Sequence, residues 1–166
     1  MSSIKALEAI NDFVVKFANV NGSGSASANE MFAKSIIRMG VPVSPRNIFP
    51  SNIQGLPTWY EVRVTEQGHL GRRGGVDFMV AMNPQTWDAD ISEIEPGGYL
   101  FYDNSKPIPA SRFREDIHVI GVPLTQICNA AYTEPRQRQL FKNIVYVGAL
   151  SALLNIDIEV IEKLIA

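Results

Sequence analysis

The chain has 166 residues, of which 46% are hydrophobic and 19% are charged, so it can bury enough apolar surface to fold as one ordinary domain. This composition excludes an intrinsically disordered chain. Its 15 basic and 17 acidic residues give a net charge of −2, which lacks the basic excess typical of nucleic-acid-binding proteins, so we expect no nucleic-acid partner.

The single cysteine, Cys128, limits the redox and metal chemistry open to the chain. One cysteine cannot form a disulfide framework, and it cannot hold an iron–sulfur cluster or a cysteine-ligated zinc within this chain alone. Its presence fits a reducing compartment. The first residues lack the apolar core of a signal peptide, and no apolar run is long enough to cross a membrane. We therefore expect a cytoplasmic protein with no membrane partner.

The first half of the chain is predicted to alternate helix and strand. Residues 3–11 have the pattern of a short amphipathic helix. Residues 13–20 are apolar except for Lys16 and Asn19, which predicts a strand covered on both faces. A glycine- and serine-rich turn leads into a helix over residues 26–39, and Gly40 stands where a C-terminal cap belongs. Prolines make the following segment, up to residue 57, extended and irregular.

The second half continues the alternation. Apolar and polar residues alternate over residues 58–65, and we expect this strand to pair as a hairpin with a buried strand over residues 76–82. The remaining segments are predicted as a short helix that starts at Asn83, strands over 99–103 and 117–122, and helices over 124–131, 133–154 and 157–166. Residues 140–154 are apolar around most of the helix, which predicts either a core helix or one shared between the core and an interface.

Strands that alternate with helices predict an α/β fold. We expect a single three-layer α/β/α domain over residues 1–166, with a mixed, mostly parallel sheet. The last helix is still in full pattern at Ala166, so we expect the chain to be the N-terminal part of a longer polypeptide.

The first candidate site is the turn between the first strand and the following helix. Such a turn presents backbone N–H groups and the positive end of a helix dipole, which bind phosphate well. The dinucleotide fingerprint is incomplete, because its third glycine would fall at Ser27 and no acidic residue lies between Glu30 and Glu61. A tight structural turn and a backbone site for another phosphate remain open. The candidates are Gly22, Ser23, Gly24 and Ser25.

A second candidate is the loop over residues 49–57, which is rich in amide and hydroxyl groups. These groups either bind a ligand or partner through neutral hydrogen bonds or serve only to satisfy a rigid connector. The candidates are Ser51, Asn52, Gln54 and Gly55.

A third candidate is a pair of arginines, Arg72 and Arg73, flanked by glycines just before a buried strand. Two arginines can hold a phosphate or carboxylate through bidentate hydrogen bonds, and flanking glycines let the backbone approach closely. An exposed hairpin tip with solvated charge is the other interpretation.

Acid–base and nucleophilic chemistry find little support. His69 lies in a predicted turn, His118 in an apolar strand and Cys128 on an apolar helix face, where each is typical of a structural residue. The hydrolase and metalloprotease motifs and any carboxylate cluster with metal spacing are missing. We assign no catalytic and no metal-binding residue, and we expect the isolated chain to be inactive.

Several segments together carry a resemblance to a known family. They are Phe-Ala-Asn-Val-Asn-Gly-Ser-Gly at 17–24, Pro-Ser-Asn-Ile-Gln-Gly at 50–55, Asp-Phe-Met-Val-Ala-Met-Asn at 77–83, Asn-Ile-Val-Tyr-Val-Gly-Ala-Leu at 143–150 and Asn-Ile-Asp at 155–157. Their order and spacing resemble the gamma domain of the 2-oxoacid:ferredoxin oxidoreductases. These enzymes decarboxylate pyruvate, 2-oxoglutarate or branched 2-oxoacids and form the acyl-CoA. In many relatives the first turn reads Gly-Gly-Gln-Gly, and the second loop carries its own Arg-Gly-Gly. The departures here are similar to the branch in which the gamma domain is fused ahead of the alpha (pyrimidine-binding) domain.

The resemblance implies a cofactor-free chain inside a larger enzyme. The holoenzyme would use thiamine diphosphate, Mg²⁺, an iron–sulfur cluster and coenzyme A (CoA), the first three held by other parts. The implied partners are the alpha domain, the beta (thiamine-diphosphate-binding) subunit and ferredoxin as electron acceptor. In this family the gamma domain lies near the CoA entry, so the three candidate segments become candidate CoA contacts. The alternative is a freestanding α/β domain that binds a phosphate ligand or nucleotide.

Overall fold

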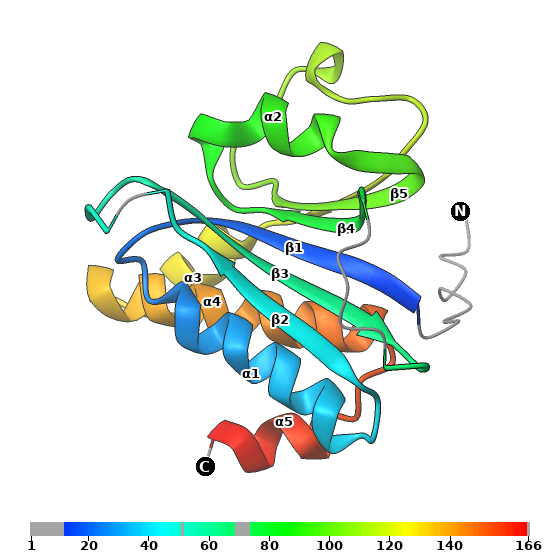
Figure 1. Cartoon of the computed structure of the whole chain (residues 1–166). Helices are drawn as coiled ribbons and strands as arrows, with labels where there is room; N and C mark the ends of the chain where they lie inside the picture. Colours follow the sequence, from blue (N-terminus) through cyan, green and yellow to red (C-terminus); the bar gives the residue numbers. More distant parts are fainter. Residues whose placement is uncertain (1–11, 51, 69–73, 166) are drawn as a thin grey trace, which may run out of the picture.

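The sheet is built around β1 (Asp12–Val20), whose side chains from Val14 to Asn19 are buried on both faces. The structure is a computed structural model that describes residues 12–50, 52–68 and 74–165 (Figure 1). The predicted helix over residues 3–11 lies outside this described part. The six strands follow the order β2-β3-β1-β4-β5-β6. Their remaining bounds are β2 Val43–Ile48, β3 Pro57–Thr65, β4 Val76–Ala81, β5 Ile94–Asp103 and β6 His118–Val122.

The predicted mixed, mostly parallel sheet is confirmed. Strands β1, β4, β5 and β6 are parallel to one another, whereas β3 pairs antiparallel with both β1 and β2. The predicted hairpin between residues 58–65 and 76–82 is wrong, because β1 lies between these two strands. Val15 pairs with Val62 on one side and with Phe78 on the other. Two strands that share a central partner have the same local pattern as two that pair directly.

One strand was not predicted. Residues 43–48 form β2, where the prolines had indicated irregular chain. Pro45 is tolerated because β2 is an edge strand, which has one side without a neighbour that requires its N–H. Strand β5 also begins at Ile94, earlier than the predicted start at residue 99.

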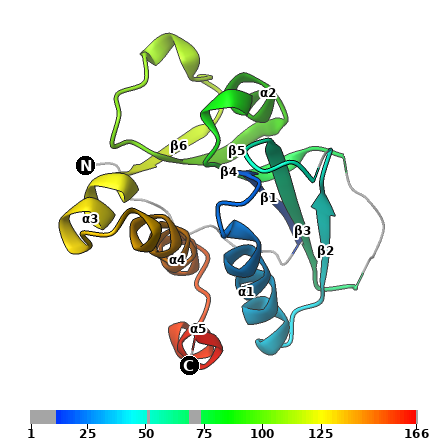
Figure 2. The same cartoon turned by 90° about the vertical axis from the view of Figure 1, so that its left-hand side faces the viewer.

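Helices cover the two faces of the sheet unequally (Figure 2). On one side of the sheet lie α1 (Ser25–Arg38), α3 (Leu124–Ala131) and α4 (Pro135–Leu153), around a core that contains Phe17, Phe32 and Tyr146, and α5 (Ile158–Ile165) packs against α1 and α4. The other face carries the short helix α2 (Trp87–Ser92) and the 3-10 turns Pro84–Thr86 and Ala110–Arg112, around a smaller core with Met79 and Leu100. No helix of the described residues is long and apolar enough to span a membrane.

Lys16 explains how a charged residue fits a buried strand. Its ammonium group pairs with the Glu93 carboxylate at 2.5 Å and lies 5.7 Å from the Trp59 ring centroid. These contacts balance the desolvation of a buried charge. They also join β1 to β3 and to the end of α2 on the thinner side of the domain.

The ends of α1 are set by glycines. Gly24 is the N-cap residue, and no side chain caps the first turn. At the other end, Gly40 N–H donates to Ile37 O at 2.9 Å and Val41 N–H donates to Ile36 O at 3.3 Å. This is the paired hydrogen-bond pattern of a glycine-terminated helix, so the predicted cap at Gly40 is confirmed.

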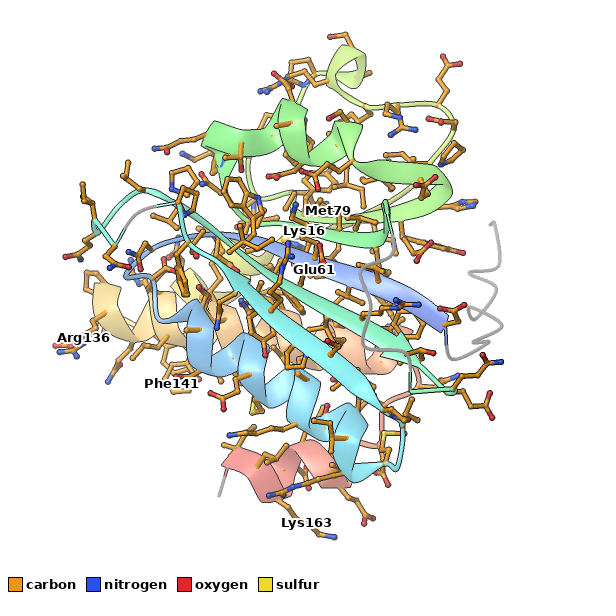
Figure 3. The ribbon with its side chains drawn as sticks, viewed as in Figure 1. Lys16, Glu61, Met79, Arg136, Phe141 and Lys163 are labelled. Atoms are coloured by element: carbon orange, nitrogen blue, oxygen red, sulfur yellow. The ribbon has the colours of Figure 1, made fainter. Side chains whose placement is uncertain are left out.

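Helix α4 is only partly a core helix. Tyr146, Val147 and Leu150 are fully buried against the sheet, whereas Leu140 and Phe141 are 47% and 38% exposed. Figure 3 shows Phe141 on the outward side of this helix. The prediction that one face of this helix belongs to the core is confirmed. The role of its exposed face in an interface stays a prediction.

Candidate functional site

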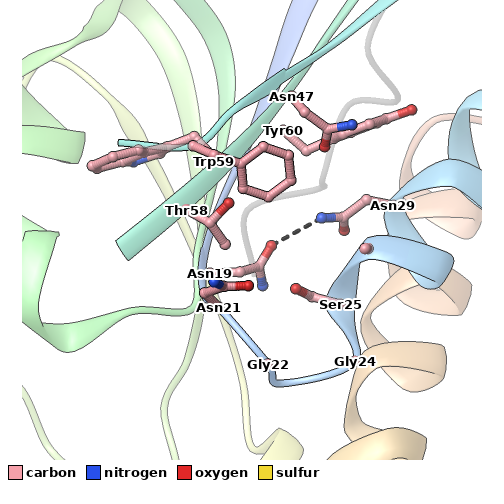
Figure 4. A pocket seen from close by; sticks show the side chains of 12 residues that line it. Asn19, Asn21, Gly22, Gly24, Ser25, Asn29, Asn47, Thr58, Trp59 and Tyr60 are labelled. Atoms are coloured by element: carbon pink, nitrogen blue, oxygen red, sulfur yellow. Dashed lines mark hydrogen bonds between the residues drawn. The ribbon is translucent and has the colours of Figure 1, made fainter. Parts of the chain in front are cut away.

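A pocket opens where β1 ends and the chain turns into α1 (Figure 4). Its volume is about 360 Å³, which is within the usual range for small-molecule sites. The walls come from the end of β1, the first turns of α1 and the paired strands β2 and β3. The lining residues are Asn19, Asn21, Gly22, Gly24, Ser25, Ala26, Asn29, Asn47, Phe49, Thr58, Trp59 and Tyr60.

The turn at this pocket requires glycine for two reasons. Gly22 and Gly24 have φ angles of +83° and +76°, in the left-handed region that strains other residues. A Cβ atom on Gly22 would lie 2.7 Å from Gln54 Cγ, and one on Gly24 would lie 2.8 Å from Leu140 Cδ2. The tight path brings the chain from β1 directly into the N-terminus of α1, which lines the pocket.

The structure brings the first two candidate segments together. Asn21 N–H donates to Leu56 O at 2.8 Å, and Gly55 N–H donates to Asn21 O at 3.0 Å. The Asn21 side-chain amide adds a hydrogen bond of 3.1 Å to Ile53 O. Gln54 packs against Gly22, as the close approach of its Cγ shows. Asn52 is described and exposed, whereas Ser51 lies outside the described residues.

The third candidate segment is not joined to this pocket by any described residue. Arg72 and Arg73 lie outside the described part of the chain. The neighbouring Gly75 immediately precedes β4. Because β4 runs parallel to β1, this glycine lies at the amino edge of the sheet, whereas the turn at Gly22 lies at the carboxyl edge.

Two buried asparagines form the floor of the pocket. Asn19 and Asn29 are 3% and 2% exposed, and Asn29 Nδ2 donates to Asn19 Oδ1 at 3.0 Å. The Tyr146 hydroxyl donates to Asn29 Oδ1 at 2.6 Å, and burial raises the pKa of Tyr146. Asn83 Nδ2 donates to Asn19 O at 3.3 Å. Asn19, Asn29 and Tyr146 therefore form one buried polar cluster beneath the pocket.

The pocket could hold an anion through backbone and neutral side-chain groups, without a cationic side chain. None of its lining side chains carries a formal charge at neutral pH. Burial, together with the nearby Glu30 carboxylate, raises the pKa of Tyr60 to about 12, so its hydroxyl stays neutral and can donate a hydrogen bond. The first turn of α1 contains no acidic residue and no side-chain cap, so its N–H groups and its dipole favour a phosphate oxygen.

The described residues place no acid–base or metal machinery at this pocket. No group of three or more His, Cys, Asp or Glu side chains in that part of the chain could hold a metal ion. His118 is exposed and stacks on Tyr99, with ring centroids 4.8 Å apart. Cys128 is buried, and burial raises the pKa of its thiol. No described residue that lines the pocket carries a His, Cys, Asp or Glu side chain, so the arrangement is suited to binding and orienting a ligand.

Residues 14–166 match the protein family described as POR, pyruvate ferredoxin/flavodoxin oxidoreductase. The chain belongs to this family. An alpha subunit of 2-oxoacid:ferredoxin oxidoreductase 2 from Aeropyrum pernix is 29% identical over 82 residues, which are 49% of this chain and 13% of that subunit. This POR-family chain thus spans a small part of that curated relative.

Solved structures show the same fold as this POR-family chain. A 2-oxoglutarate:ferredoxin oxidoreductase from Magnetococcus marinus, with 2-oxoglutarate, CoA and succinyl-CoA bound, has a TM-score of 0.82 at 24% identity and covers 94% of this chain and 27% of its own. A pyruvate oxidoreductase subunit from Thermotoga maritima has a TM-score of 0.71 at 19% identity, covering 92% of this chain and 83% of that subunit. A gamma subunit from Geobacter sulfurreducens has a TM-score of 0.70 at 19% identity, with 92% and 84% covered. The resemblance to oxidoreductase gamma domains is therefore confirmed for the fold and the family.

Several lining residues of the POR-family pocket were not predicted from the sequence, because nothing in their local pattern distinguishes them from other strand or helix residues. They are Asn29, Asn47, Thr58 and Tyr60. Asn19 gave the one available hint, because an amide in an otherwise apolar buried strand needs a polar partner.

Proposed function

We propose that this chain is the gamma domain of a thiamine-diphosphate-dependent 2-oxoacid:ferredoxin oxidoreductase, which converts a 2-oxoacid oxidatively to an acyl-CoA. Family membership over residues 14–166 and the fold of gamma subunits support this proposal. We further propose that the chain works in the cytoplasm. Its partners would be the alpha (pyrimidine-binding) domain and the beta (thiamine-diphosphate-binding) subunit, with ferredoxin as the electron acceptor of the complex.

The residues of this chain do not fit the thiamine or iron–sulfur groups. The single thiol, Cys128, is buried and cannot ligate a cluster by itself. The described residues also lack a carboxylate set that could hold the Mg²⁺ of a diphosphate cofactor. We assign these groups to the partner subunits.

Coenzyme A fits the pocket at Gly22 better. The observation that carries this assignment is the turn itself: glycines impose its shape, and it leads into the uncapped first turn of α1 at the edge of one small pocket. Backbone N–H groups at a helix N-terminus bind diphosphates without a fixed cation. A pocket of about 360 Å³ can hold only part of CoA, which fits a surface that guides the molecule toward an active site on other subunits.

The complete enzyme provides the test of this proposal. The full subunit is purified together with the subunits that accompany it and assayed for ferredoxin reduction with pyruvate, 2-oxoglutarate and a branched 2-oxoacid. We expect reduction that requires both one of these acids and CoA. Ferredoxin reduction that is absent for every acid, or independent of CoA, would reject the proposal.

Calorimetry separates the proposal from a freestanding nucleotide-binding domain. The incomplete glycine fingerprint and the missing ribose-binding acid argue against NAD. The chain should therefore bind CoA in preference to NAD. Tight binding of NAD by the chain without its partners would favour the freestanding alternative.

A further inference from the structure

A second pocket lies at the same edge of the sheet, beyond the ends of β4 and β5. Its volume is about 390 Å³, and α2, α3, α4 and the 3-10 turn Ala110–Arg112 contribute to its walls. It shares no lining residue with the pocket at Gly22. Nothing in the proposed CoA role uses this second pocket.

The apolar wall of the second pocket is aromatic and well fixed. Trp87 is 4% exposed and meets Tyr102 edge to face, with ring centroids 5.5 Å apart. Phe113 packs on the Trp87 ring in the same way at 5.7 Å, and the indole N–H donates to Arg112 O at 3.2 Å. Held on several sides, these rings form a fixed apolar wall against which the apolar part of a ligand can pack.

The pocket also has an excess of positive charge. Lys106 is exposed and makes no ion pair with a described residue, and Arg112 lies 6.0 Å from the Trp87 ring centroid while it pairs with Asp88 at 2.9 Å. Lys142 is 21% exposed in its side chain. Three cationic side chains therefore line one small volume.

The only acidic residue among the lining residues is already balanced. The Asp103 carboxylate pairs with Lys142 at 2.8 Å and accepts a hydrogen bond from the Thr125 hydroxyl. Burial alone would raise the pKa of Asp103, but hydrogen bonds from Lys142, Ser105 and Thr125 outweigh burial and lower it, so the carboxylate stays ionised. Lys106 thus remains as the lining cation without an ion pair to a described residue, and Arg112 shares its guanidinium with the exposed Asp88 carboxylate.

We propose that the second pocket binds a small organic anion, with an apolar planar body against Trp87 and Tyr102 and a carboxylate or phosphate against Lys106 and Arg112. A pocket of this size lined by aromatic side chains and a few converging charges is the usual form of a small-molecule site. Guanidinium and ammonium groups bind oxyanions through charge-assisted hydrogen bonds, and a partly enclosed site strengthens them. The site is separate from the one that we assign to CoA.

The two tryptophans of the chain allow both pockets to be observed at once. Trp59 lines the pocket at Gly22 and Trp87 lines the second pocket. Fluorine NMR of the full chain labelled with 5-fluorotryptophan therefore gives one resonance for each pocket. Phenyl phosphate and benzoate are the anionic ligands to titrate, and phenol is the neutral control.

We expect phenyl phosphate or benzoate to shift the Trp87 resonance saturably, with little change at Trp59. Phenol should bind about tenfold more weakly, because it lacks the charge-assisted hydrogen bonds. The tighter of the two anions identifies the oxyanion that the site prefers. The absence of a saturable shift at Trp87, or equal binding of phenol, would overturn the proposal.

Charge variants give a second, independent readout. Lys106→Gln and Arg112→Gln should each weaken binding of the preferred anion about tenfold. Lys163→Gln is the matched control, because Lys163 is exposed on α5 (Figure 3) and should leave binding unchanged. Equal affinities in Lys106→Gln and Lys163→Gln would contradict the proposed contact.

Titration with CoA keeps the two assignments distinguishable. CoA should shift Trp59 and leave Trp87 in place. A CoA-induced shift at Trp87 that displaces phenyl phosphate or benzoate would show one shared site and overturn the separate second site. If CoA shifts neither resonance while an anion shifts Trp87, the CoA assignment fails and the second site stands.

Discussion

Asn143 on α4 donates a hydrogen bond of 2.9 Å from its Nδ2 atom to the carbonyl oxygen of Ser23, although the two residues are 120 positions apart in the chain. Asn143 is 3% exposed, so this bond is protected from water. It connects the glycine turn of the candidate CoA pocket to a helix that is distant in the sequence. The shape of the pocket therefore depends on tertiary packing as well as on its local glycines.

Asn143→Ala should loosen this turn. The free energy of unfolding should fall by about 1–2 kcal/mol, because the Ser23 carbonyl loses its partner and a small cavity remains. Urea unfolding measures the change. Gln139→Ala on an exposed position of the same helix is the control and should have little effect. Equal stabilities of the two variants would show that the bond contributes nothing.

Gly22→Ala should destabilise the domain through both strain and contact. The left-handed φ angle costs about 1 kcal/mol for any residue with a Cβ, and displacement of Gln54 adds to that cost. Gly68→Ala is the control for backbone strain without a steric contact, since the φ of Gly68 is +70° and nothing lies within 4 Å of an added Cβ. The extra cost at Gly22 should largely disappear when Gln54→Ala is added. If Gln54→Ala gives no relief, the described contact is not the cause.

The Asp103 carboxylate should make stability depend on pH. Its pKa is lower in the folded chain than the value of about 3.9 in the unfolded chain, so its stabilising effect is present above that value and is lost as the pH falls. Asp103→Asn should reduce the free energy of unfolding by about 1–3 kcal/mol at neutral pH. The difference between wild type and variant should shrink as the pH is lowered below about 4. A difference that stays constant across this range would contradict the ionised, paired carboxylate.

The buried thiol should report on unfolding. Cys128 is 2% exposed, and burial raises the pKa of its thiol, so the reactive thiolate is scarce in the native chain. A disulfide reagent such as DTNB should label it slowly under native conditions and rapidly in denaturant. Fast and complete labelling of the native protein would show that this helix face opens readily.

Local patterns were enough to predict most elements. The apolar run of β1, the glycine turn and the helix with its cap at Gly40 depend on neighbours within a few residues, and the sequence shows them directly. Long-range pairing was beyond these patterns. Nothing in residues 58–65 or 76–82 indicates that each pairs with β1 instead of with the other. Strand β2 was not predicted because it contains Pro45, and a proline in an edge strand has the same local pattern as one in a loop.

The site was predictable to the same degree. The glycine turn and the loop over residues 49–57 are rich in turn-forming residues, which the sequence shows directly. Thr58 and Tyr60 reach the pocket only because β3 is the neighbour of β1, so their role follows from the topology. Arg72 and Arg73 remain candidates from the sequence alone.

The central claim is that the N-terminus of α1 guides CoA, and substitution of Ala26 tests it most directly. Ala26 is exposed in the first turn of α1 and lines the pocket. A glutamate in the first turn interacts favourably with the helix dipole, so Ala26→Glu should fold normally. Its negative charge should repel a diphosphate at the same position. In the complete enzyme, Ala26→Glu should raise KM for CoA about tenfold and leave KM for the 2-oxoacid unchanged, whereas Ala26→Gln should resemble wild type. An unchanged KM for CoA in Ala26→Glu would contradict the account.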